Sequence, residues 1–362
     1  MELLHDISLR GFHTFATEAK ARYFLEFTDP EDLRDLWRAH PALFDKVLIV
    51  GGGSNLLFTG DFEGMVIRPA EAGIAVERED TDHVWLRAGA GVWWDDFVRF
   101  AVERGWGGVE NLSLIPGRVG AVPVQNIGAY GCEAAEVVSQ VTGMELPSGN
   151  FRVFDVEECR FSYRSSLFKE VLKNRFLITS VVFQLDKEPR LKLEYSELKT
   201  ELMEHFKGSK ASPFNGSPVE KAAGGGISLQ QVRDAVIRIR TRKLPDPAEV
   251  GNAGSFFKNP VVAEEAAKQL KAAFPALPLY PAETRSPGKG EKPVKLSAGW
   301  LIDQCGWKGF RRGDAGVHHD HALVLVNYGQ ATGREIFQLA EEIRLSVKER
   351  FGVDLEREVI VV

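Results

Sequence analysis

The chain has 362 residues, of which 44% are hydrophobic and 27% charged, and its formal net charge at pH 7 is −6. This length predicts more than one domain, and the composition is that of an ordinary soluble globular protein. The net negative charge argues against a protein that coats nucleic acid or an anionic membrane surface.

Neither a targeting segment nor a cysteine pattern is recognisable in the sequence. No apolar run approaches the roughly 20 residues that span a bilayer, and the first residues lack a secretion signal. The three cysteines, Cys132, Cys159 and Cys305, are too far apart to suggest a metal site or a disulfide set. We therefore expect a cytoplasmic protein.

The first predicted elements form a small α/β unit. A strand at residues 23–27 precedes a helix whose capping box we assign to Thr28 and Glu31, with Pro30 in the first turn. A second strand at residues 46–50 runs into a cluster of glycines.

Residues 73–187 are strand-rich, with a helix at about 93–104. Ser228 and Gln231 form a second capping box, which opens a helix that ends at the Leu-Pro-Asp-Pro sequence of residues 244–247. We place a domain boundary there.

The remaining chain is predicted to contain one long helix at residues 333–350 and a short terminal strand at 355–362. Residues 207–226 and 284–292 are rich in Gly, Ser, Pro and Lys, which predicts mobile loops.

The first glycine motif, Gly-Gly-Gly-Ser-Asn-Leu-Leu at residues 51–57, directly follows a predicted strand. Leu56 stands where a Rossmann fingerprint needs its third glycine, and no Gly-Lys-Ser/Thr follows, so neither common nucleotide motif matches. Backbone N–H groups in such a turn can converge on a phosphate, but a tight turn without a ligand is equally consistent with the sequence.

A second glycine-rich segment spans residues 114–131 and contains Leu-Ile-Pro-Gly-Arg-Val-Gly and then Gln-Asn-Ile-Gly-Ala-Tyr-Gly. A backbone-exposing loop of this kind favours a ligand, although a simple connector stays possible.

Three further positions are candidates for chemistry. If their segment is extended, Tyr163 and Arg164 point to opposite faces, and Arg164 is either an interior cation for an anion or a surface salt-bridge partner. Ser255 is either a proton donor or the cap of a turn. Glu358 shares a strand face with Glu356, which is also typical of a solvated edge.

Two clusters favour structural interpretations. Adjacent histidines on a strand point to opposite faces, and no carboxylate or cysteine motif completes a set with His318, His319 and His321, so we predict no metal site. Cations at a helix C-terminus either form an anion-binding patch or are favoured by the helix dipole. The cations concerned are Arg238, Arg240, Arg242 and Lys243.

Taken in order, the five motifs resemble one protein family, the UDP-N-acetylenolpyruvoylglucosamine reductases. The resemblance covers nearly the whole chain, and its most specific part is the segment 251–260 preceded by Lys-Leu-Pro-Asp-Pro at 243–247. One departure is the pair Ala121 and Val122, which stands where small or hydroxyl residues are frequent. A flavin phosphate contact is therefore either lost here or made by the backbone.

The resemblance implies an α+β, three-domain flavoprotein. Two domains, at residues 1–69 and 70–243, would form an FAD-binding unit of the vanillyl-alcohol-oxidase/PCMH type, with a C-terminal strand at 352–362 completing the second. An α/β domain at 244–351 would bind substrate.

The resemblance also implies the site residues. Catalysis would fall on Arg164, Ser255 and Glu358. FAD would be held non-covalently by Gly51, Gly52, Gly53, Ser54, Asn55, Leu56, Pro116, Gly117, Gly120, Asn126, Gly128, Tyr130 and Gly131. The substrate contacts would be Tyr163, Tyr195, Lys243, Asn259 and Gln304. Tyr195 matches a tyrosine on a loop that folds over the substrate in one subtype of the family.

The implied reaction is the NADPH-dependent reduction of UDP-N-acetylglucosamine enolpyruvate to UDP-N-acetylmuramate, a step in peptidoglycan precursor synthesis. NADPH and the sugar would use one cavity in turn, and FAD would pass the hydride to C3 of the enolpyruvyl double bond. Arg164, with Glu358 beside it, would stabilise the charge that spreads onto the substrate carboxylate, while Ser255 would protonate C2. We expect a monomer with no nucleic-acid or membrane partner.

Two competing functions are considered. A flavin oxidase of the same superfamily would react with oxygen, and many such enzymes tether FAD through histidine or cysteine; here only Cys132 lies near the second glycine segment. A nucleotide-binding module without catalysis is disfavoured because Arg164, Ser255 and Glu358 are all present.

Overall fold

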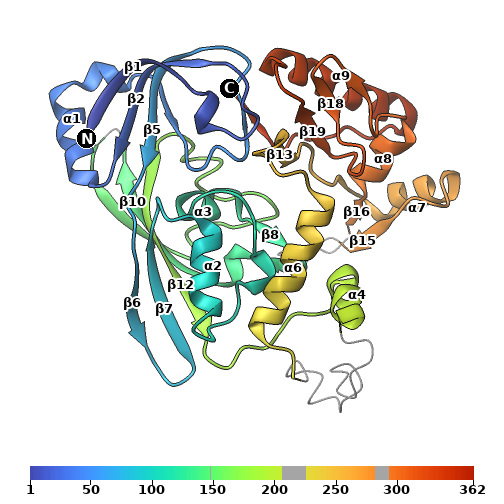
Figure 1. The fold of residues 1–362 in the computed structure, drawn as a ribbon, viewed down its shortest axis with the longest axis horizontal. Helices are drawn as coiled ribbons and strands as arrows, with labels where there is room; N and C mark the ends of the chain where they lie inside the picture. Colours follow the sequence, from blue (N-terminus) through green and yellow to red (C-terminus); the bar gives the residue numbers. More distant parts are fainter. Residues whose placement is uncertain (147, 206–225, 282–292) are drawn as a thin grey trace. The chain divides into compact units, whose positions relative to one another are not determined.

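The computed structural model describes residues 1–146, 148–205, 226–281 and 293–362. The loops predicted at 207–226 and 284–292 lie outside the described residues, except for Gly226. Within the described chain, contacts define two compact units (Figure 1). The first contains Met1–Asp6, Arg22–Gly52 and Glu63–Arg242, and the second contains Ile7–Ala21, Gly53–Phe62 and Lys243–Val362.

The division into three domains stays a prediction. One unit boundary falls between Arg242 and Lys243, beside the predicted end of the second FAD-binding subdomain, and residues 352–362 belong to the second unit.

The first unit is built around two sheets. One has the strand order β1-β2-β5-β3, with β3 and β5 parallel, and the other has the order β11-β10-β12-β7-β6 with antiparallel neighbours. A short hairpin, β8-β9, is separate from both. The strands are β1 (Glu2–Ser8), β2 (Lys20–Phe27), β3 (Val47–Ile49), β5 (Phe62–Pro69), β6 (Ile74–Glu79), β7 (His83–Gly89), β8 (Gly128–Ala129), β9 (Cys132–Glu133), β10 (Val138–Glu145), β11 (Phe151–Asp155) and β12 (Phe176–Asp186).

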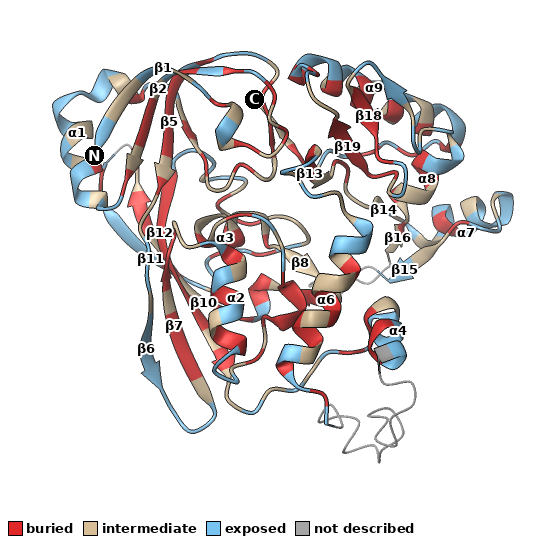
Figure 2. Cartoon of the chain, viewed as in Figure 1, coloured by how far each residue is buried: buried red, intermediate tan, exposed pale blue. Residues whose placement is uncertain are grey.

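Helices complete the described part of the first unit. They are α1 (Pro30–Ala39), α2 (Trp94–Val102), α3 (Val122–Gln125), α4 (Ser196–His205) and α6 (Leu229–Lys243). Phe97 of α2 packs against Phe183 of β12 with ring centroids 4.5 Å apart. Figure 2 shows the inner strands β7 and β12 largely buried, whereas the edge strand β6 is exposed.

The two predicted capping boxes have different outcomes. The assignment to Thr28 is wrong, because the first helix is capped by Asp29, whose carboxylate accepts a hydrogen bond from the Glu31 N–H at 2.9 Å. Pro30 occupies the first helical position, so the preceding residue is the natural N-cap, and aspartate is among the best caps. The box of Ser228 and Gln231 is confirmed by both of its hydrogen bonds.

The second unit contains a sheet of order β13-β19-β18-β17, a three-stranded sheet β14-β16-β15, and the parallel pair β20-β4. Its strands are β4 (Leu56–Leu57), β13 (Gly251–Ser255), β14 (Val261–Val262), β15 (Leu279–Pro281), β16 (Val294–Leu296), β17 (Arg311–Arg312), β18 (Ala315–Val317), β19 (Val324–Asn327) and β20 (Ile360–Val361). Its helices are α7 (Glu264–Ala273), α8 (Ala298–Gln304) and α9 (Gly333–Phe351).

The terminal strand is shorter than predicted. Only Ile360 and Val361 pair with β4, while Arg357 forms an isolated bridge to Phe257. The predicted long helix is confirmed as α9, and its core-facing residues are fully buried: Ile336, Leu339, Ala340, Ile343 and Val347.

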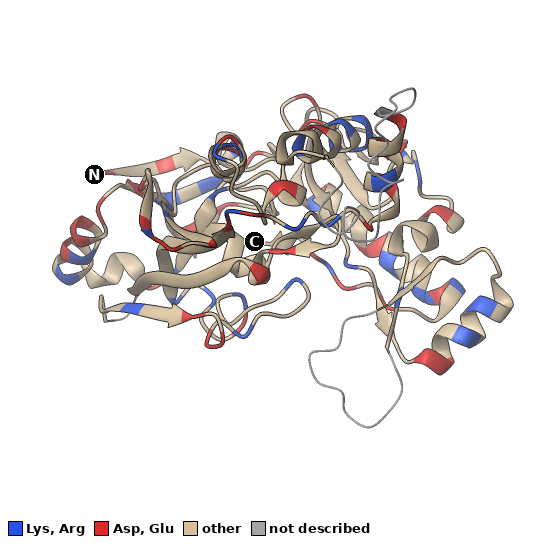
Figure 3. Cartoon of the chain, turned by 90° about the horizontal axis from the view of Figure 1, so that it is seen from below, with Lys and Arg blue, Asp and Glu red and all other residues tan. Residues whose placement is uncertain are grey.

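None of the described helices is long and apolar enough to cross a membrane. Figure 3 shows Lys and Arg interspersed with Asp and Glu along the ribbon.

Candidate active site

The two predicted glycine segments meet inside the first unit. The backbones of Gly52 and Gly117 are so close that no side chain fits between them, because a Cβ atom added to Gly52 would lie 2.8 Å from the Gly117 Cα. A Cβ added to Gly51 would touch Cβ of Ala121 at 3.4 Å. The fold therefore joins residues that are far apart in the sequence into one backbone surface.

This surface offers hydrogen-bond donors. Among the described residues, the N–H groups of Gly51, Gly52, Gly117 and Arg118 donate to no backbone carbonyl. Unused N–H groups in a glycine turn form a concave, electropositive site for an anionic group such as a phosphate. The residues present thus fit the phosphate-binding role predicted for them.

Asn126 organises the second glycine segment from inside. It is fully buried and adopts a left-handed backbone with φ of 44°. Its amide donates to a Glu133 carboxylate oxygen at 2.8 Å and to the Ser162 carbonyl at 3.0 Å, and its carbonyl oxygen accepts from the Ala135 N–H at 3.0 Å. The side chain thus shapes the loop through protein contacts.

Arg164 lies in a tight turn, and the extended backbone considered for this segment is wrong. Ser162 and Ser165 pair across the turn, and Arg164 has a φ of 54°. Its guanidinium donates to the Gly128 carbonyl at 2.6 Å and lies 5.3 Å from the ring centroid of Tyr163. The turn therefore brings the predicted catalytic cation onto the second glycine segment.

Tyr130 and Tyr195 also come together in the first unit. Their rings meet edge-on with centroids 5.4 Å apart, and Tyr195 is 46% exposed. Burial raises the pKa of the Tyr130 hydroxyl to about 12, although the charge of Arg240 opposes this. The neighbouring α4 is fixed to α6 because Glu201 accepts hydrogen bonds from Arg238 and Arg242.

The predicted anion patch on α6 is thus largely occupied by protein partners. Arg238 and Arg242 pair with Glu201, and Arg240 donates through Nε to the Leu114 carbonyl at 3.2 Å. These contacts support the structural interpretation for three of the four cations.

The remaining residues of the first glycine motif belong to the second unit. A Cβ on Gly53, whose φ is 66°, would lie 2.0 Å from the Phe12 carbonyl oxygen, so this position requires glycine. Asn55 donates its amide to the Glu358 carbonyl at 3.1 Å, and Leu56 is buried in the β4-β20 pair.

Ser255 is presented by an irregularity at the end of β13. The register of β13 against β19 shifts between Asn252 and Ser255, and Gly254 adopts a φ of 66° while its N–H donates to the Asn252 side chain at 2.9 Å. Bulges of this kind re-aim side chains and are frequent beside active sites. Within the described residues, no hydrogen bond holds the Ser255 hydroxyl.

Glu358 lies on the segment directly beside that of Ser255. Its N–H donates to the Phe256 carbonyl at 2.8 Å, and the bridge between Phe257 and Arg357 continues this pairing. Glu356, in contrast, is exposed and ion-pairs with Lys258. The structure therefore brings together Ser255, Glu358 and Asn55, which the sequence left in three separate motifs.

The predicted substrate contacts of the second unit are in diverse surroundings. Asn259 accepts the Ala298 N–H at 3.0 Å at the start of α8, and Gln304, at the end of α8, is exposed and accepts Arg350 on its carbonyl. Lys243 is exposed at the end of α6. Their roles stay predictions.

Cys132 lines a separate polar hollow of about 330 Å³ in the first unit, with Glu110, Glu136, Asp186 and Lys192. Burial, aided by the charge of Glu136, raises the pKa of the Cys132 thiol to about 12. Such a thiol is almost entirely protonated at neutral pH and is a poor nucleophile.

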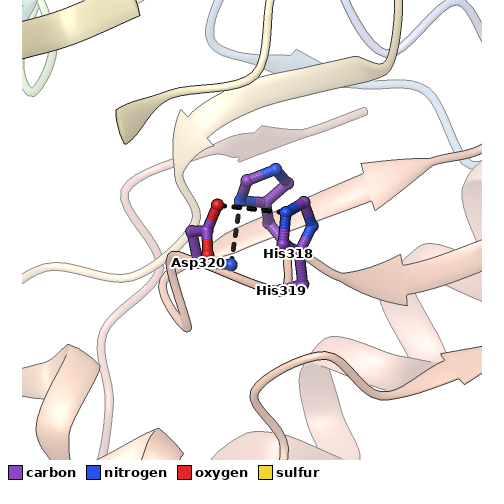
Figure 4. A group of neighbouring side chains, drawn as sticks. All are labelled: His318, His319 and Asp320. Carbon is purple, nitrogen blue, oxygen red and sulfur yellow. Dashed lines mark hydrogen bonds and ion pairs between the residues drawn. The ribbon is translucent and has the colours of Figure 1, made fainter. Parts of the chain in front are cut away.

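A possible metal-ligand cluster lies on the loop after β18 (Figure 4). Candidate ligand atoms of His318, His319 and Asp320 all lie within 4.8 Å of one another. The prediction that no carboxylate joins the histidines is wrong. These residues lie on a loop and not on a strand, so the Asp320 carboxylate turns toward His319, with Oδ2 3.0 Å from Nε2. The His319 and Asp320 side chains are 70% and 63% exposed, and the absence of a metal site stays a prediction.

The chain is similar to known proteins over its whole length. Residues 246–362 match the family model of the UDP-N-acetylenolpyruvoylglucosamine reductase C-terminal domain, and residues 21–155 match that of an FAD binding domain. The UDP-N-acetylenolpyruvoylglucosamine reductase of Chromobacterium violaceum is 46% identical over 358 residues, covering 98% of each chain. The Flavobacterium johnsoniae protein of the same name is 40% identical over the full length of both.

Solved structures support the predicted fold class. The Thermus caldophilus UDP-N-acetylenolpyruvylglucosamine reductase (MurB) covers 99% of this chain and 98% of its own, with a TM-score of 0.63 and 24% identity. The 6-hydroxy-D-nicotine oxidase of Arthrobacter nicotinovorans covers 98% and 86%, with a TM-score of 0.50 and 15% identity. The α+β flavoprotein fold of the vanillyl-alcohol-oxidase/PCMH type is confirmed. With its identity to whole-length relatives, this chain belongs to the UDP-N-acetylenolpyruvoylglucosamine reductase family.

Proposed function

We propose that this chain is an FAD-containing, NADPH-dependent reductase that converts UDP-N-acetylglucosamine enolpyruvate to UDP-N-acetylmuramate in peptidoglycan precursor synthesis. Its whole-length similarity to reductases of that name supports the activity. The FAD binding domain match contains both glycine segments, and the C-terminal match contains Ser255 and Glu358. We also propose that it acts as a cytoplasmic monomer.

The structural observation that carries the proposal is the close approach of Gly52 to Gly117. Their unused N–H groups are directed at no protein carbonyl among the described residues, and they would hold the phosphates of FAD. When bound, FAD would supply the hydride chemistry that connects NADPH with the enolpyruvyl double bond.

Arg164 is proposed to stabilise the negative charge that develops on the substrate carboxylate. Its guanidinium is held by the Gly128 carbonyl, so its position is fixed before the substrate arrives. A preorganised cation aimed at developing charge is usually the largest single contribution to catalysis.

Ser255 is proposed to donate the proton to C2 of the substrate. The bulge after Asn252 presents its hydroxyl, and Glu358 lies on the adjacent segment, where its carboxylate can tune the local field. Proton donation by a positioned hydroxyl contributes about 10²–10⁴-fold in rate.

The substrate contacts proposed for Tyr163, Tyr195, Lys243, Asn259 and Gln304 come from the family resemblance. The structure supports one local element of this proposal. Tyr195 is exposed and packs on Tyr130, while the α4–α6 ion pairs fix the helix that follows it, so its ring is available at a defined place.

An oxidase with tethered FAD is the second candidate. The buried Cys132 thiol does not favour it, because a thiol with a pKa of about 12 is not poised to attack a flavin.

The proposed function is tested by an anaerobic two-step absorbance experiment on the purified chain. NADPH should bleach the flavin absorbance at one equivalent, and the enolpyruvyl sugar should restore it. Recovery only on admission of air would favour the oxidase. A colourless protein that cannot bind added FAD would overturn the proposal.

A further inference from the structure

Arg118 lies at the point where the two glycine segments meet. Its Cβ is 3.9 Å from a Cβ added to Gly51. Its guanidinium lies 5.1 Å from the ring centroid of Trp93, and the Trp93 ring in turn lies 3.3 Å from a Cβ added to Gly52. The Arg118 side chain thus begins beside Gly51, and its cation lies near a ring that contacts the Gly52 position.

The hydrogen bonds of Arg118 are incomplete within the described chain. Nη1 donates to the Pro69 carbonyl at 2.8 Å, but Nε is buried and has no hydrogen-bond partner among the described residues. A buried donor without a partner costs about 1–3 kcal/mol. Such a cost is explicable if a ligand supplies the missing acceptor.

A second cation lies near Arg118. It is Arg68, which is ion-paired with Glu26. Burial lowers the pKa of the Arg118 guanidinium, and repulsion from Arg68 lowers it further. A bound anion would offset this repulsion, because it would attract both cations.

A purely structural role explains less. An arginine is not required to pack beside Trp93 or to fill this volume, since a methionine has similar length without an orphan donor. A single bond to the Pro69 carbonyl uses one of the five N–H groups of the guanidinium. The planar fork is instead the geometry that binds phosphate oxygens in pairs.

We propose that Arg118 binds a diphosphate group at the junction of the glycine segments, together with the N–H groups of Gly51, Gly52 and Gly117, and that this diphosphate is that of FAD. Trp93 is the positioning residue, because its ring holds the guanidinium. This assignment rests on the proposed function. It also gives a substitute for the phosphate contact that Ala121 cannot make with a hydroxyl.

The test measures flavin affinity and not turnover. The full-length chain is stripped of flavin and titrated with FAD and with riboflavin, which lacks the diphosphate, and flavin fluorescence reports binding. For Arg118→Met, the Kd for FAD should rise about 10–100-fold, as expected for the loss of charge-assisted hydrogen bonds, while the Kd for riboflavin stays that of the wild type. Arg118→Lys should recover part of the loss. Arg99→Met, which removes an exposed arginine of α2, is the control and should change neither Kd.

Salt dependence tests the charge of Arg118 with a second variant. The affinity for FAD should fall with rising ionic strength more steeply in the wild type than in Arg118→Gln, whereas that for riboflavin should not change with salt in either; equal slopes for FAD would overturn the inference. This arm remains informative if Arg118→Met fails to fold.

Each alternative has its own result. Equal loss of FAD and riboflavin affinity would make Arg118 a structural clamp and would overturn the inference. An unchanged Kd for FAD with weaker binding of NADPH or of the UDP-sugar would reassign the diphosphate to a substrate, which also overturns it. A wild-type chain without affinity for any flavin would overturn the proposed function, whereas failure of the Arg118 arm alone leaves that function intact.

Discussion

The turn that contains Arg164 and the bulge that presents Ser255 both depend on left-handed backbone, but they achieve it differently. Arg164 adopts a φ of 54° itself, whereas in the second unit Gly254, with a φ of 66°, takes the left-handed position and Ser255 follows it. A residue with a Cβ is strained there by roughly 1–2 kcal/mol, and glycine is not.

Different contacts therefore hold the two side chains in place. Hydrogen bonds maintain the Arg164 turn. The Arg164 guanidinium donates to the Gly128 carbonyl, and the Lys169 ammonium donates to the Arg164 carbonyl at 2.9 Å. No hydrogen bond from the Ser255 hydroxyl to the described residues supports its bulge. The bulge is instead held by glycine and by backbone pairing with residues 357–358. Replacing Ser255 should therefore change chemistry alone, whereas replacing Arg164 should change chemistry and local structure.

The largest effect is expected for Ser255→Ala. Flavin reduction by NADPH should be unchanged, and reoxidation of the flavin by the enolpyruvyl sugar should slow by about 10²–10⁴-fold, in stopped-flow absorbance. The unfolding midpoint should not move. Ser297→Ala is the control: it removes the cap of α8, so it should lower stability by about 1 kcal/mol without affecting either half-reaction. Equal slowing of both half-reactions by Ser255→Ala would remove the proton-donor role.

Glu358→Gln tests whether the neighbour of Ser255 contributes its charge. The carboxamide preserves the shape, so the backbone pairing to Phe256 should persist, but reoxidation by the sugar should slow as for Ser255→Ala, by about 10²-fold or more. The exposed Glu356→Gln should be indistinguishable from the wild type. A normal second half-reaction in Glu358→Gln would exclude this carboxylate from the chemistry.

Arg164→Lys tests the cation of the other turn. Lysine keeps the positive charge and the left-handed backbone strain, so a deficit reports the loss of the planar fork together with its hydrogen bond to the Gly128 carbonyl. We expect sugar-dependent reoxidation to fall by about 10²–10³-fold. The matched control is Arg160→Lys, an exposed arginine of the same segment with a φ of 49°, which should keep normal turnover. Near-normal turnover of Arg164→Lys would indicate a structural arginine.

Asp95→Asn probes the framework of the first unit. Asp95 pairs with Arg233 through two contacts of 2.7 Å and accepts the Leu114 N–H at 2.6 Å, so it links α2 and α6 to the second glycine segment. The Arg233 side chain is 7% exposed and that of Asp95 33%, so the loss in unfolding free energy should be roughly 2–4 kcal/mol, less than for a fully buried pair. Chemical denaturation measures it, and the exposed neighbour Asp96→Asn should cost under about 0.5 kcal/mol.

The same pair predicts a pH dependence. Burial raises the pKa of Asp95, but the hydrogen bonds from Arg233 and Leu114 and the charge of Arg233 lower it more, so the net pKa lies below its ordinary value. This stabilisation is complete above the unfolded pKa of about 4 and is lost as pH falls through the lower folded value. The stability of wild type and Asp95→Asn should thus converge in acid. A constant difference down to strongly acidic pH would contradict the pairing.

Local sequence determined much of this protein. The helices α6 and α9 and the capping box of Ser228 and Gln231 depend on residues within a few positions of one another, so they could be predicted. The choice between neighbouring N-cap candidates was harder to predict. Asp29 caps the first helix in place of Thr28, because Pro30 fixes where that helix begins.

Contacts between distant segments were decided only by the tertiary structure. No pattern in the sequence indicates that Gly52 meets Gly117, that Arg118 lies beside Gly51, or that Glu358 pairs beside Ser255. The sequence does show an arginine inside a glycine-rich segment, which was a signal for Arg118. It does not show that Nε lacks a hydrogen-bond partner among the described residues or that the side chain lies beside Trp93. Backbone hydrogen bonding and close packing act across space, so their partners become definite only when the chain has folded.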